Sequence, residues 1–382
     1  MCNVPDPESL IALRKELHKF PELSGYEEVT SQRISSFLEK LKPDQIMNNI
    51  GGYGVAARFK GEIPGPRVMI RAEMDALPIN ESNSSDHNST VSGVSHSCGH
   101  DGHMAIAAGV ASCFAATRPE RGELVVLFQP SEENGKGAFK VLNDVQFSSV
   151  MPDYILALHN LPGFALNEIV LRDGVFSMAS VGMITELKGK TSHAAEPENG
   201  VSPSKAVARI IMDLPGLPER SEFRHFALAT IIHTRIGEIA FGTTPGDAVV
   251  MATLRAYDND EMEQMVVLAE ELVRQIAESE GLAVSVEWTE KFPATLNDRL
   301  LNEIAVEKGE EMGLKINHIK DAFKWSEDFG WFTHKFKGLL FGIGAGKGHP
   351  ELHNPDYDFP DEISETGIGL LTSVSRELLN FK

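Results

Sequence analysis

The amino-acid sequence predicts an α/β fold, in which helices sandwich a sheet and a smaller α+β domain is inserted into the chain. Continuous apolar runs at 124–128 and 154–158 are typical of strands buried on both faces. These runs alternate with helical patterns, as in α/β proteins. Between residues 176 and 289 the order changes to β-α-β-β-α-β, which is typical of a ferredoxin-like domain. We therefore expect two domains, residues 1–175 with 290–382 and residues 176–289.

The larger domain is predicted to begin with two helices. Apolar side chains recur near helical spacing in both, and Pro21 ends the first helix. A short apolar strand, a polar loop rich in glycine and serine, and an alanine-rich helix follow. These five elements are expected at 8–20, 30–41, 68–72, 80–97 and 101–117.

The inserted domain is predicted to hold four strands and two helices. Its strands are expected at 178–188, 227–236, 248–257 and 283–288, and its helices at 203–213 and 259–280. The second helix is amphipathic, so one of its faces is expected to be buried. The α/β pattern then resumes with a helix at 298–312, a strand at 338–343 and a helix at 361–380.

The composition excludes several classes of function. The chain has 382 residues, and 35 Lys and Arg against 55 Asp and Glu give a net charge of −20. Such a chain repels phosphate, which argues against binding to nucleic acid or to an anionic membrane. Three cysteines, Cys2, Cys98 and Cys113, are too few for a disulfide framework. The first residues lack the features of a signal peptide, and we expect a cytoplasmic protein.

The densest polar segment of the sequence covers residues 96–103. It places three histidines, one thiol and one carboxylate immediately before a predicted helix. Cys98 and His100 are ligands that suit a borderline-soft divalent metal. Their spacing is not that of a standard structural zinc site, so the alternative of a polar loop with an ordinary buried cysteine stays open.

A pair of acids follows the apolar strand at 124–128. Glu132 and Glu133 lie at the carboxyl end of that strand, where α/β proteins place their sites. One carboxylate can bind a metal while the other acts as a general base on water. The alternative is a solvated acidic turn, and for an isolated pair of acids we favour that alternative.

Three more histidines are weak candidates on their own. His159 ends the apolar strand at 154–158, His353 follows a glycine-rich turn, and His193 precedes a turn of small residues in the inserted domain. A lone histidine is more often a core or surface residue than a ligand. Taken together, five candidate ligands fall at strand ends or loops of one α/β layer: Cys98, His100, Glu133, His159 and His353. Five ligands suit two metal ions, whereas a single tetrahedral zinc needs three or four.

The chain resembles the aminoacylase/carboxypeptidase superfamily of binuclear metallohydrolases. Within it, the chain is most similar to the hippurate hydrolases and the plant auxin–amino-acid conjugate hydrolases. The matching segments span nearly the whole chain in the family's order: 17–23, 71–78, 98–104, 128–133, 192–197, 326–329 and 352–357.

The resemblance implies a fold and a set of roles. The larger domain would be a mixed-sheet, metallopeptidase-like catalytic domain, and the insertion a lid that also forms a homodimer. The five candidate ligands would hold two divalent ions, zinc or manganese first and cobalt or nickel next. Glu132 would be the general base, Asp75 and Asp101 would orient ligands, and His193 would stabilise the oxyanion, in its own subunit or in a neighbouring one.

The activity that the resemblance implies is hydrolysis of the amide bond in N-acyl amino acids or related small amides, by attack of a metal-bound water. A metallo-dipeptidase or carboxypeptidase on the same scaffold, and a non-catalytic metal-binding homologue, are the alternatives. Three departures from the family pattern leave the substrate open: Glu73 replaces an aspartate, 242–245 reads Gly-Thr-Thr-Pro where Asn-x-x-Pro is usual, and 80–95 lacks the basic residue that is usual in this loop.

Overall fold

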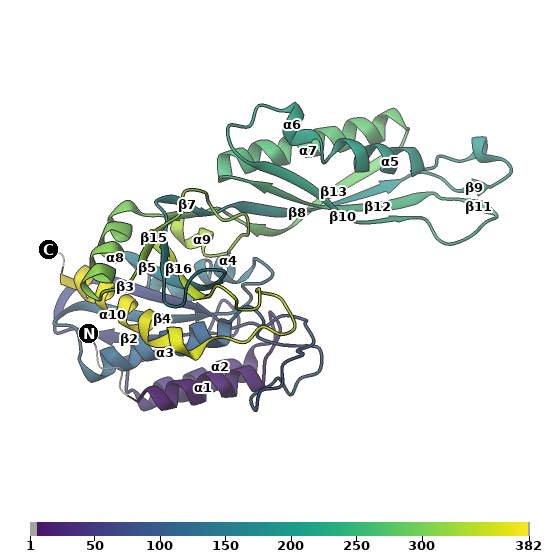
Figure 1. Ribbon diagram of the computed structural model, residues 1–382. Helices are drawn as coiled ribbons and strands as arrows, with labels where there is room; N and C mark the ends of the chain where they lie inside the picture. The colour runs from purple at the N-terminus through teal and green to yellow at the C-terminus, as the bar shows by residue number, and fades with distance from the viewer. Residues whose placement is uncertain (1–5, 381–382) are drawn as a thin grey trace. The chain divides into compact units, whose positions relative to one another are not determined.

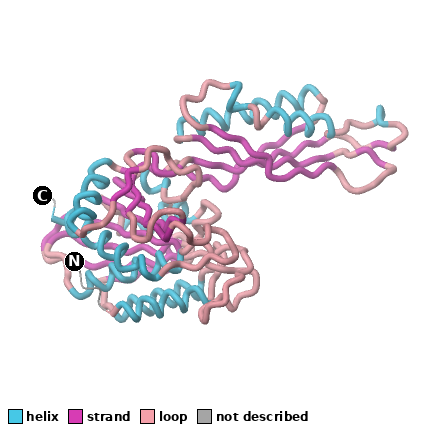
Figure 2. Tube along the Cα trace, in the orientation of Figure 1, coloured by secondary structure: helices cyan, strands magenta, loops and turns pink. Residues whose placement is uncertain are grey.

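The computed structural model describes residues 6–380, which form two compact units (Figures 1 and 2). The larger unit contains the chain up to Phe176, then Thr295–Ala322 and the chain from Glu327 onward. The smaller unit contains Ser177–Ala294 and Phe323–Ser326. Cys2 lies outside the described residues. Among residues 6–380, no helix has the length and apolar character needed to cross a membrane.

The larger unit is built on a mixed eight-stranded sheet. Its strands, in spatial order, are β1 (Gln45–Ile50), β2 (Gly54–Lys60), β4 (Arg121–Gln129), β3 (Ile63–Glu73), β5 (Tyr154–Pro162), β16 (Lys337–Gly346), β6 (Ile169–Leu171) and β15 (Ile316–His318). The central strands β4, β3, β5 and β16 run parallel, whereas β1, β2 and β4 pair antiparallel. The apolar residues of β4 are fully buried, as the sequence predicts for a strand covered on both faces.

Helices of the larger unit pack against this sheet and against one another. The long helices are α1 (Pro7–Lys19), α2 (Glu28–Lys40), α3 (His100–Ala116), α8 (Arg299–Glu311) and α10 (Ser364–Asn380). Helix α3 contacts β3 and β4 on one side and α1 and α10 on others (Figure 1). Because it is enclosed in this way, α3 is buried along almost its whole length and is rich in alanine rather than amphipathic.

The smaller unit has the β-α-β-β-α-β order that the sequence predicts. Its antiparallel sheet consists of β10 (Ala227–Ile236), β12 (Asp247–Ala256), β8 (Ala179–Lys188) and β13 (Ala283–Phe292), in that order. Helices α5 (Ser204–Asp213) and α7 (Asn259–Ser279) pack on it. Residues of β12 alternate between buried and half-buried, which is the period of a strand with one face in a core.

The unit boundaries differ from the predicted limits of 176 and 289. Strand β13 continues to Phe292, so a boundary at 289 falls inside a strand. The short segment Phe323–Ser326 also belongs to the smaller unit, because the Met178 amide donates a hydrogen bond of 3.0 Å to the Phe323 carbonyl. These four residues show no sequence pattern that predicts their place in the smaller unit.

Strand β2 and the short elements of the larger unit are the parts of that unit that the sequence pattern did not predict. The edge strand β1 contains Gln45, Asn48 and Asn49 and so lacks the apolar alternation that indicates a strand. Strands β6 and β15 have only three residues each. Other short elements of this unit are β7 (Gly174–Ser177) at its boundary, β14 (Thr295–Asn297), α4 (Gly137–Leu142) and α9 (Gly330–Thr333), and the smaller unit contains the short helix α6 (Leu217–Arg220).

Candidate metal centre

The five candidate ligands all lie in the larger unit, near the carboxyl ends of its central strands. Glu133 follows β4, His159 lies on β5, and His353 follows β16. Cys98 ends the loop before α3, and His100 is the first residue of that helix. The loops that leave the carboxyl ends of parallel strands meet at one edge of a sheet, which is where open α/β sheets form their sites.

The ligand atoms of these five residues lie within coordination reach of one another. The Cys98 Sγ is 3.5 Å from the His159 Nε2. The His100 Nε2 is 3.8 Å from the Glu133 Oε1, and the His353 Nε2 is 4.0 Å from the Glu133 Oε2. The atoms form two groups, each within 4.8 Å, that share one thiol: Cys98, His100 and His159, and Cys98, Glu133 and His353. Two overlapping ligand groups are what a dinuclear centre requires.

Two buried atoms in this cluster lack any hydrogen-bond partner. They are the His100 Nε2 and the Glu133 Oε1, which face each other. Leaving a buried polar atom unsatisfied costs about 1–3 kcal/mol, and more for a charged one. The other ring nitrogen of His100 donates a hydrogen bond of 2.8 Å to the Asp75 carbonyl, which leaves the Nε2 lone pair directed into the cluster. The donor set therefore fits divalent metal ions.

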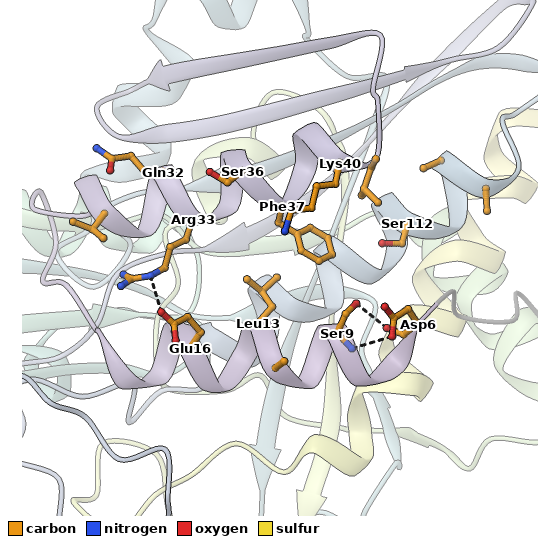
Figure 3. Close-up of a pocket in the computed structure, with 15 residues that line it drawn as sticks. Asp6, Ser9, Leu13, Glu16, Gln32, Arg33, Ser36, Phe37, Lys40 and Ser112 are labelled. Atoms are coloured by element: carbon orange, nitrogen blue, oxygen red, sulfur yellow. Dashed lines mark hydrogen bonds and ion pairs between the residues drawn. The ribbon is translucent and has the colours of Figure 1, made fainter.

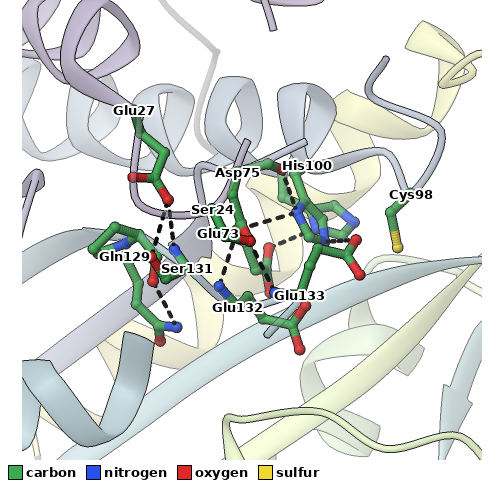
Figure 4. Close-up of polar contacts among 12 residues, drawn as sticks. Ser24, Glu27, Glu73, Asp75, Cys98, His100, Gln129, Ser131, Glu132 and Glu133 are labelled. Carbon is green, nitrogen blue, oxygen red and sulfur yellow. Dashed lines mark hydrogen bonds and ion pairs between the residues drawn. The ribbon is translucent and has the colours of Figure 1, made fainter. Parts of the chain in front are cut away.

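Asp75 holds the acidic pair in place (Figure 4). Its carboxylate, which is fully buried, accepts the backbone N–H groups of Glu132 and Glu133, each at 3.0 Å. The Ser24 hydroxyl donates to the same carboxylate at 2.6 Å. Asp75 thus contacts His100 through its carbonyl and the turn after β4 through its side chain.

The turns on either side of the cluster have special backbone conformations. Gly99 has a φ of 88°, and a Cβ atom at this position would come within 2.5 Å of the Asn160 Oδ1. Only glycine fits between Cys98 and His100 for these two reasons. His353 has a φ of 64°, and its amide donates a hydrogen bond of 2.8 Å to the Ser97 carbonyl.

Burial shifts the pKa values of two histidines, His159 and His353, and of two carboxylates, Glu132 and Glu133, in the cluster. Burial raises the pKa of Glu132 well above its usual value, and the charges of Glu327 and Glu133 raise it further. Burial raises the pKa of Glu133 to about 7. Burial lowers the pKa of His159 to about 3 and also lowers that of His353. A neutral imidazole is the form that binds metal.

Asp101 is placed differently from the expectation. Its carboxylate accepts a hydrogen bond of 2.8 Å from the His18 Nδ1 and lies 3.5 Å from the Arg14 guanidinium. Both partners lie on α1, so Asp101 joins α1 to α3 rather than contacting one of the five candidate ligands. The expectation missed this because the direction of a side chain on α3 depends on how the helix is packed.

His193 belongs to the smaller unit, where it is exposed on the short strand β9 (Ser192–His193). This strand pairs with β11 (Thr243–Thr244), and Thr243 lies opposite His193. The His193 Nδ1 accepts the Ala195 N–H at 3.1 Å. In the neutral ring the proton therefore lies on Nε2, which makes that atom a hydrogen-bond donor.

Several buried polar residues near the cluster received no role from the sequence. Glu73 pairs with the Arg71 guanidinium and accepts a hydrogen bond of 2.7 Å from the His103 Nδ1. It therefore serves a buried network, in the position where the family usually has aspartate. The carboxylates of Asp328, Glu132 and Glu327 form another group, with oxygen atoms within 4.8 Å of one another. Two features of the sequence pointed to these residues. Glu73 is a charged residue at the end of a buried strand, and residues 326–329 match the family pattern.

A cavity of about 860 Å³ lies elsewhere in the larger unit (Figure 3). It lies between α1 and α2 and reaches the end of α3, with Leu13 and Phe37 among its apolar lining and Arg33 paired to Glu16 at its edge. None of the five candidate ligands lines it. The metal cluster, and not this cavity, is therefore the candidate site.

The sequence model of peptidase family M20/M25/M40 matches residues 69–377. The N-acetyl-L-cysteine deacetylase of Bacillus subtilis (strain 168) is 31% identical over 366 residues, covering 94% of this chain and 85% of the relative. The N-acetyldiaminopimelate deacetylase of Anoxybacillus flavithermus is 30% identical, covering 95% of each chain. The crystal structure of a dinuclear metal-binding M20 peptidase from Bacillus subtilis superposes with a TM-score of 0.83 at 26% identity, covering 98% of this chain and 99% of that one.

Proposed function

The chain belongs to peptidase family M20/M25/M40, as its resemblance to the binuclear metallohydrolases indicated, and we propose that it is a metal-dependent amidohydrolase that cleaves the amide bond of N-acyl amino acids. One observation carries the proposal: two overlapping ligand groups contain the orphaned buried atoms of His100 and Glu133, with the Glu132 carboxylate adjoining them. The names of two relatives, which deacetylate N-acetylcysteine and N-acetyldiaminopimelate, support the substrate class.

We propose that the five ligands hold two divalent ions. The dinuclear M20 peptidase that superposes on this chain supports the number of ions. The thiolate of Cys98 favours zinc, while the carboxylate and imidazole ligands also suit manganese. When bound, such ions lower the pKa of a coordinated water and polarise the substrate carbonyl.

Glu132 is the residue that moves the proton in this proposal. Its buried carboxylate, with a raised pKa, accepts a proton from the attacking water and then delivers it to the nitrogen of the leaving amine. A positioned general base contributes roughly 10²–10⁴-fold to the rate. Asp75 keeps the carboxylate in place through the backbone of the same turn.

His193 supplies the oxyanion donor in this proposal. Its Nε2 carries the proton in the neutral ring, because Nδ1 accepts the Ala195 N–H. It can therefore donate to an oxyanion without first becoming charged. Such a donor is worth roughly 3–4 kcal/mol. The homodimer through the smaller unit and the cytoplasmic location are further proposals.

Release of amine from a panel of amides tests the function. The panel contains N-acetyl, N-benzoyl and longer N-acyl amino acids together with dipeptides, each assayed with Zn²⁺ or Mn²⁺ and with a chelator. We expect chelator-sensitive turnover of the N-acyl amino acids. Turnover of dipeptides alone would make the chain a dipeptidase, and metal binding without any turnover would favour a non-catalytic homologue.

A further inference from the structure

We infer that Asp328 and Arg71 are positioning residues: the Asp328 backbone N–H fixes the orientation of the Glu132 carboxylate, and Arg71 fixes Asp328. The inference rests on the proposed function in that it takes Glu132 as the general base. It assigns a task to the segment at 326–329, for which neither the sequence nor the proposed function has one.

Asp328 touches Glu132 through its backbone. Its N–H donates to the Glu132 Oε1 at 3.3 Å, and both residues are buried. A backbone amide cannot lose its proton or rotate away, so the direction of this donor is set by where the chain runs. An acceptor held by such a donor keeps one orientation through a reaction cycle in which its own proton comes and goes.

The side chain of Asp328 is held on several sides. Its Oδ1 accepts a hydrogen bond of 2.6 Å from the Arg71 Nη2, and its Oδ2 accepts 2.8 Å bonds from the Gln129 Nε2 and the Ala138 N–H. Charge-assisted bonds of this kind are short and directional. These bonds restrain the position of Asp328 and so limit how far the backbone N–H of the same residue can move.

Arg71 joins three separate segments at this point. Its side chain is fully buried on β3, where it pairs with Glu73. Its Nε donates to the Gln129 Oε1 at 2.9 Å, at the end of β4, and its Nη2 also donates to the Glu327 Oε1 at 2.9 Å. The planar guanidinium holds these partners in one fixed arrangement, which an ammonium group cannot reproduce.

The balance of charge shows why Glu132 needs such a donor. Three buried carboxylates, Glu73, Glu327 and Asp328, pair with the Arg71 guanidinium, and the buried carboxylate of Glu132 lies beside the last two. Repulsion from its neighbours would push the Glu132 carboxylate away, and Arg71 already has other carboxylate partners. The N–H of Asp328 offers Glu132 an attractive contact that does not depend on that guanidinium.

The path of the chain explains why the donor is anchored so firmly. Phe323–Ser326 belongs to the smaller unit, and the chain re-enters the larger unit at Glu327. Within the smaller unit, the Arg255 guanidinium holds this segment by hydrogen bonds to the Lys324 carbonyl at 2.9 Å and the Ser326 hydroxyl at 3.1 Å. Asp328 is thus two residues from a unit boundary, and Arg71 supplies its anchor in the larger unit.

Kinetics of Asp328→Asn and Arg71→Lys test the inference, with Glu123→Gln as the control. Glu123 is a buried carboxylate that pairs with Arg58 and Arg67. It lies on β4, the strand that ends at Gln129, but near the opposite end of that strand. We expect both test variants to lower kcat at least about tenfold, because a misplaced base loses part of its contribution. KM and metal content should stay within about twofold of wild type, and Glu123→Gln should change only Tm. Test variants that lose Tm but keep kcat would overturn the inference.

A second readout does not need activity. In protein labelled with ¹⁵N-aspartate, the resonance absent from Asp328→Asn identifies the Asp328 amide. We expect it to move upfield and exchange faster with solvent in Glu132→Gln and Glu132→Ala, and to stay in place in Glu123→Gln. An unchanged resonance in both Glu132 variants would contradict the hydrogen bond. If the wild type turned over no member of the panel, the proposed function would be refuted. The Asp328 amide resonance would then still test whether the Asp328 N–H binds Glu132.

Discussion

Two of the three candidate histidine ligands, His100 and His159, are oriented by their second ring nitrogen. The His100 Nδ1 donates to the Asp75 carbonyl at 2.8 Å, and the His159 Nδ1 donates to the Asn160 carbonyl at 2.9 Å. These bonds leave the Nε2 atom of each ring directed into the cluster as the atom available to a metal. Loss of such an outer partner typically costs 10–100-fold in metal affinity.

Cys98 should set the preference for the metal. In Cys98→Ser a hard hydroxyl replaces a soft thiolate, so zinc affinity should fall at least about tenfold and manganese affinity much less. Competition titration with a chelating dye measures both affinities. His334→Ala, a change outside the cluster, serves as control. Equal losses for both metals in Cys98→Ser would contradict the role of the thiolate.

The types of residue in the site were predictable from the sequence, whereas their partners were not. The dense polar segment before a predicted helix indicated Cys98 and His100, and the position after an apolar strand indicated Glu133, because strand ends meet at one edge of a sheet. The direction of Asp101 toward His18 and the burial of Arg71 depend on packing between distant segments. No local pattern encodes that packing.

At the level of secondary-structure elements, a buried charge network ties α1 to α3. His18 donates to Asp101 at 2.8 Å, and its Nε2 is 3.0 Å from the Glu81 carboxylate. Asp358 lies 3.9 Å from the same ring, and the rings of His87 and His96 lie beside it. Since α3 begins with His100, this network also holds the start of the helix that carries a candidate ligand.

The network should make stability depend on pH through His18. Burial of the ring lowers the pKa of His18, but the charge of Asp101 and the hydrogen bonds to Asp101 and Glu81 outweigh burial and raise it to about 10. Because the folded pKa exceeds the unfolded value of about 6.5, the stabilisation is complete below pH 6.5 and is lost as pH rises through about 10.

Urea unfolding of the wild type and of His18→Gln between pH 6.5 and 10 measures this effect. The wild type should lose free energy of unfolding with a slope that is up to about 1.4 kcal/mol per pH unit steeper than in His18→Gln. The same slope in both proteins would show that His18 keeps an ordinary pKa in the folded state. His225→Gln, an exposed histidine of the smaller unit, is the matched control.

At the level of the whole molecule, the α/β class and the inserted β-α-β-β-α-β unit were predictable because long strands and helices have clear periods. Short strands such as β6 and β15, with three residues each, have too few residues to show a period. The segment Phe323–Ser326 joins the smaller unit through long-range contacts, which no local sequence pattern predicts.

Subunit mixing tests whether His193 serves the site of a neighbouring copy. Glu132→Gln and His193→Ala are each expected to be inactive. If His193 acts between copies, their mixture should recover up to about a quarter of wild-type activity by the statistics of random pairing, because half the dimers are mixed and each has one intact site. Absence of recovery, with exchange of subunits verified by differently tagged chains, would place His193 in the same subunit as its site.

The most direct measurement is metal content and amine release on one sample of Glu132→Gln. The substitution keeps the shape of the side chain and leaves all five candidate ligands in place. The proposed mechanism predicts two bound ions per chain, as in the wild type, and loss of turnover. A variant that binds both ions and keeps even a tenth of the wild-type rate, a loss far below the roughly 10²–10⁴-fold contribution of a general base, would contradict it.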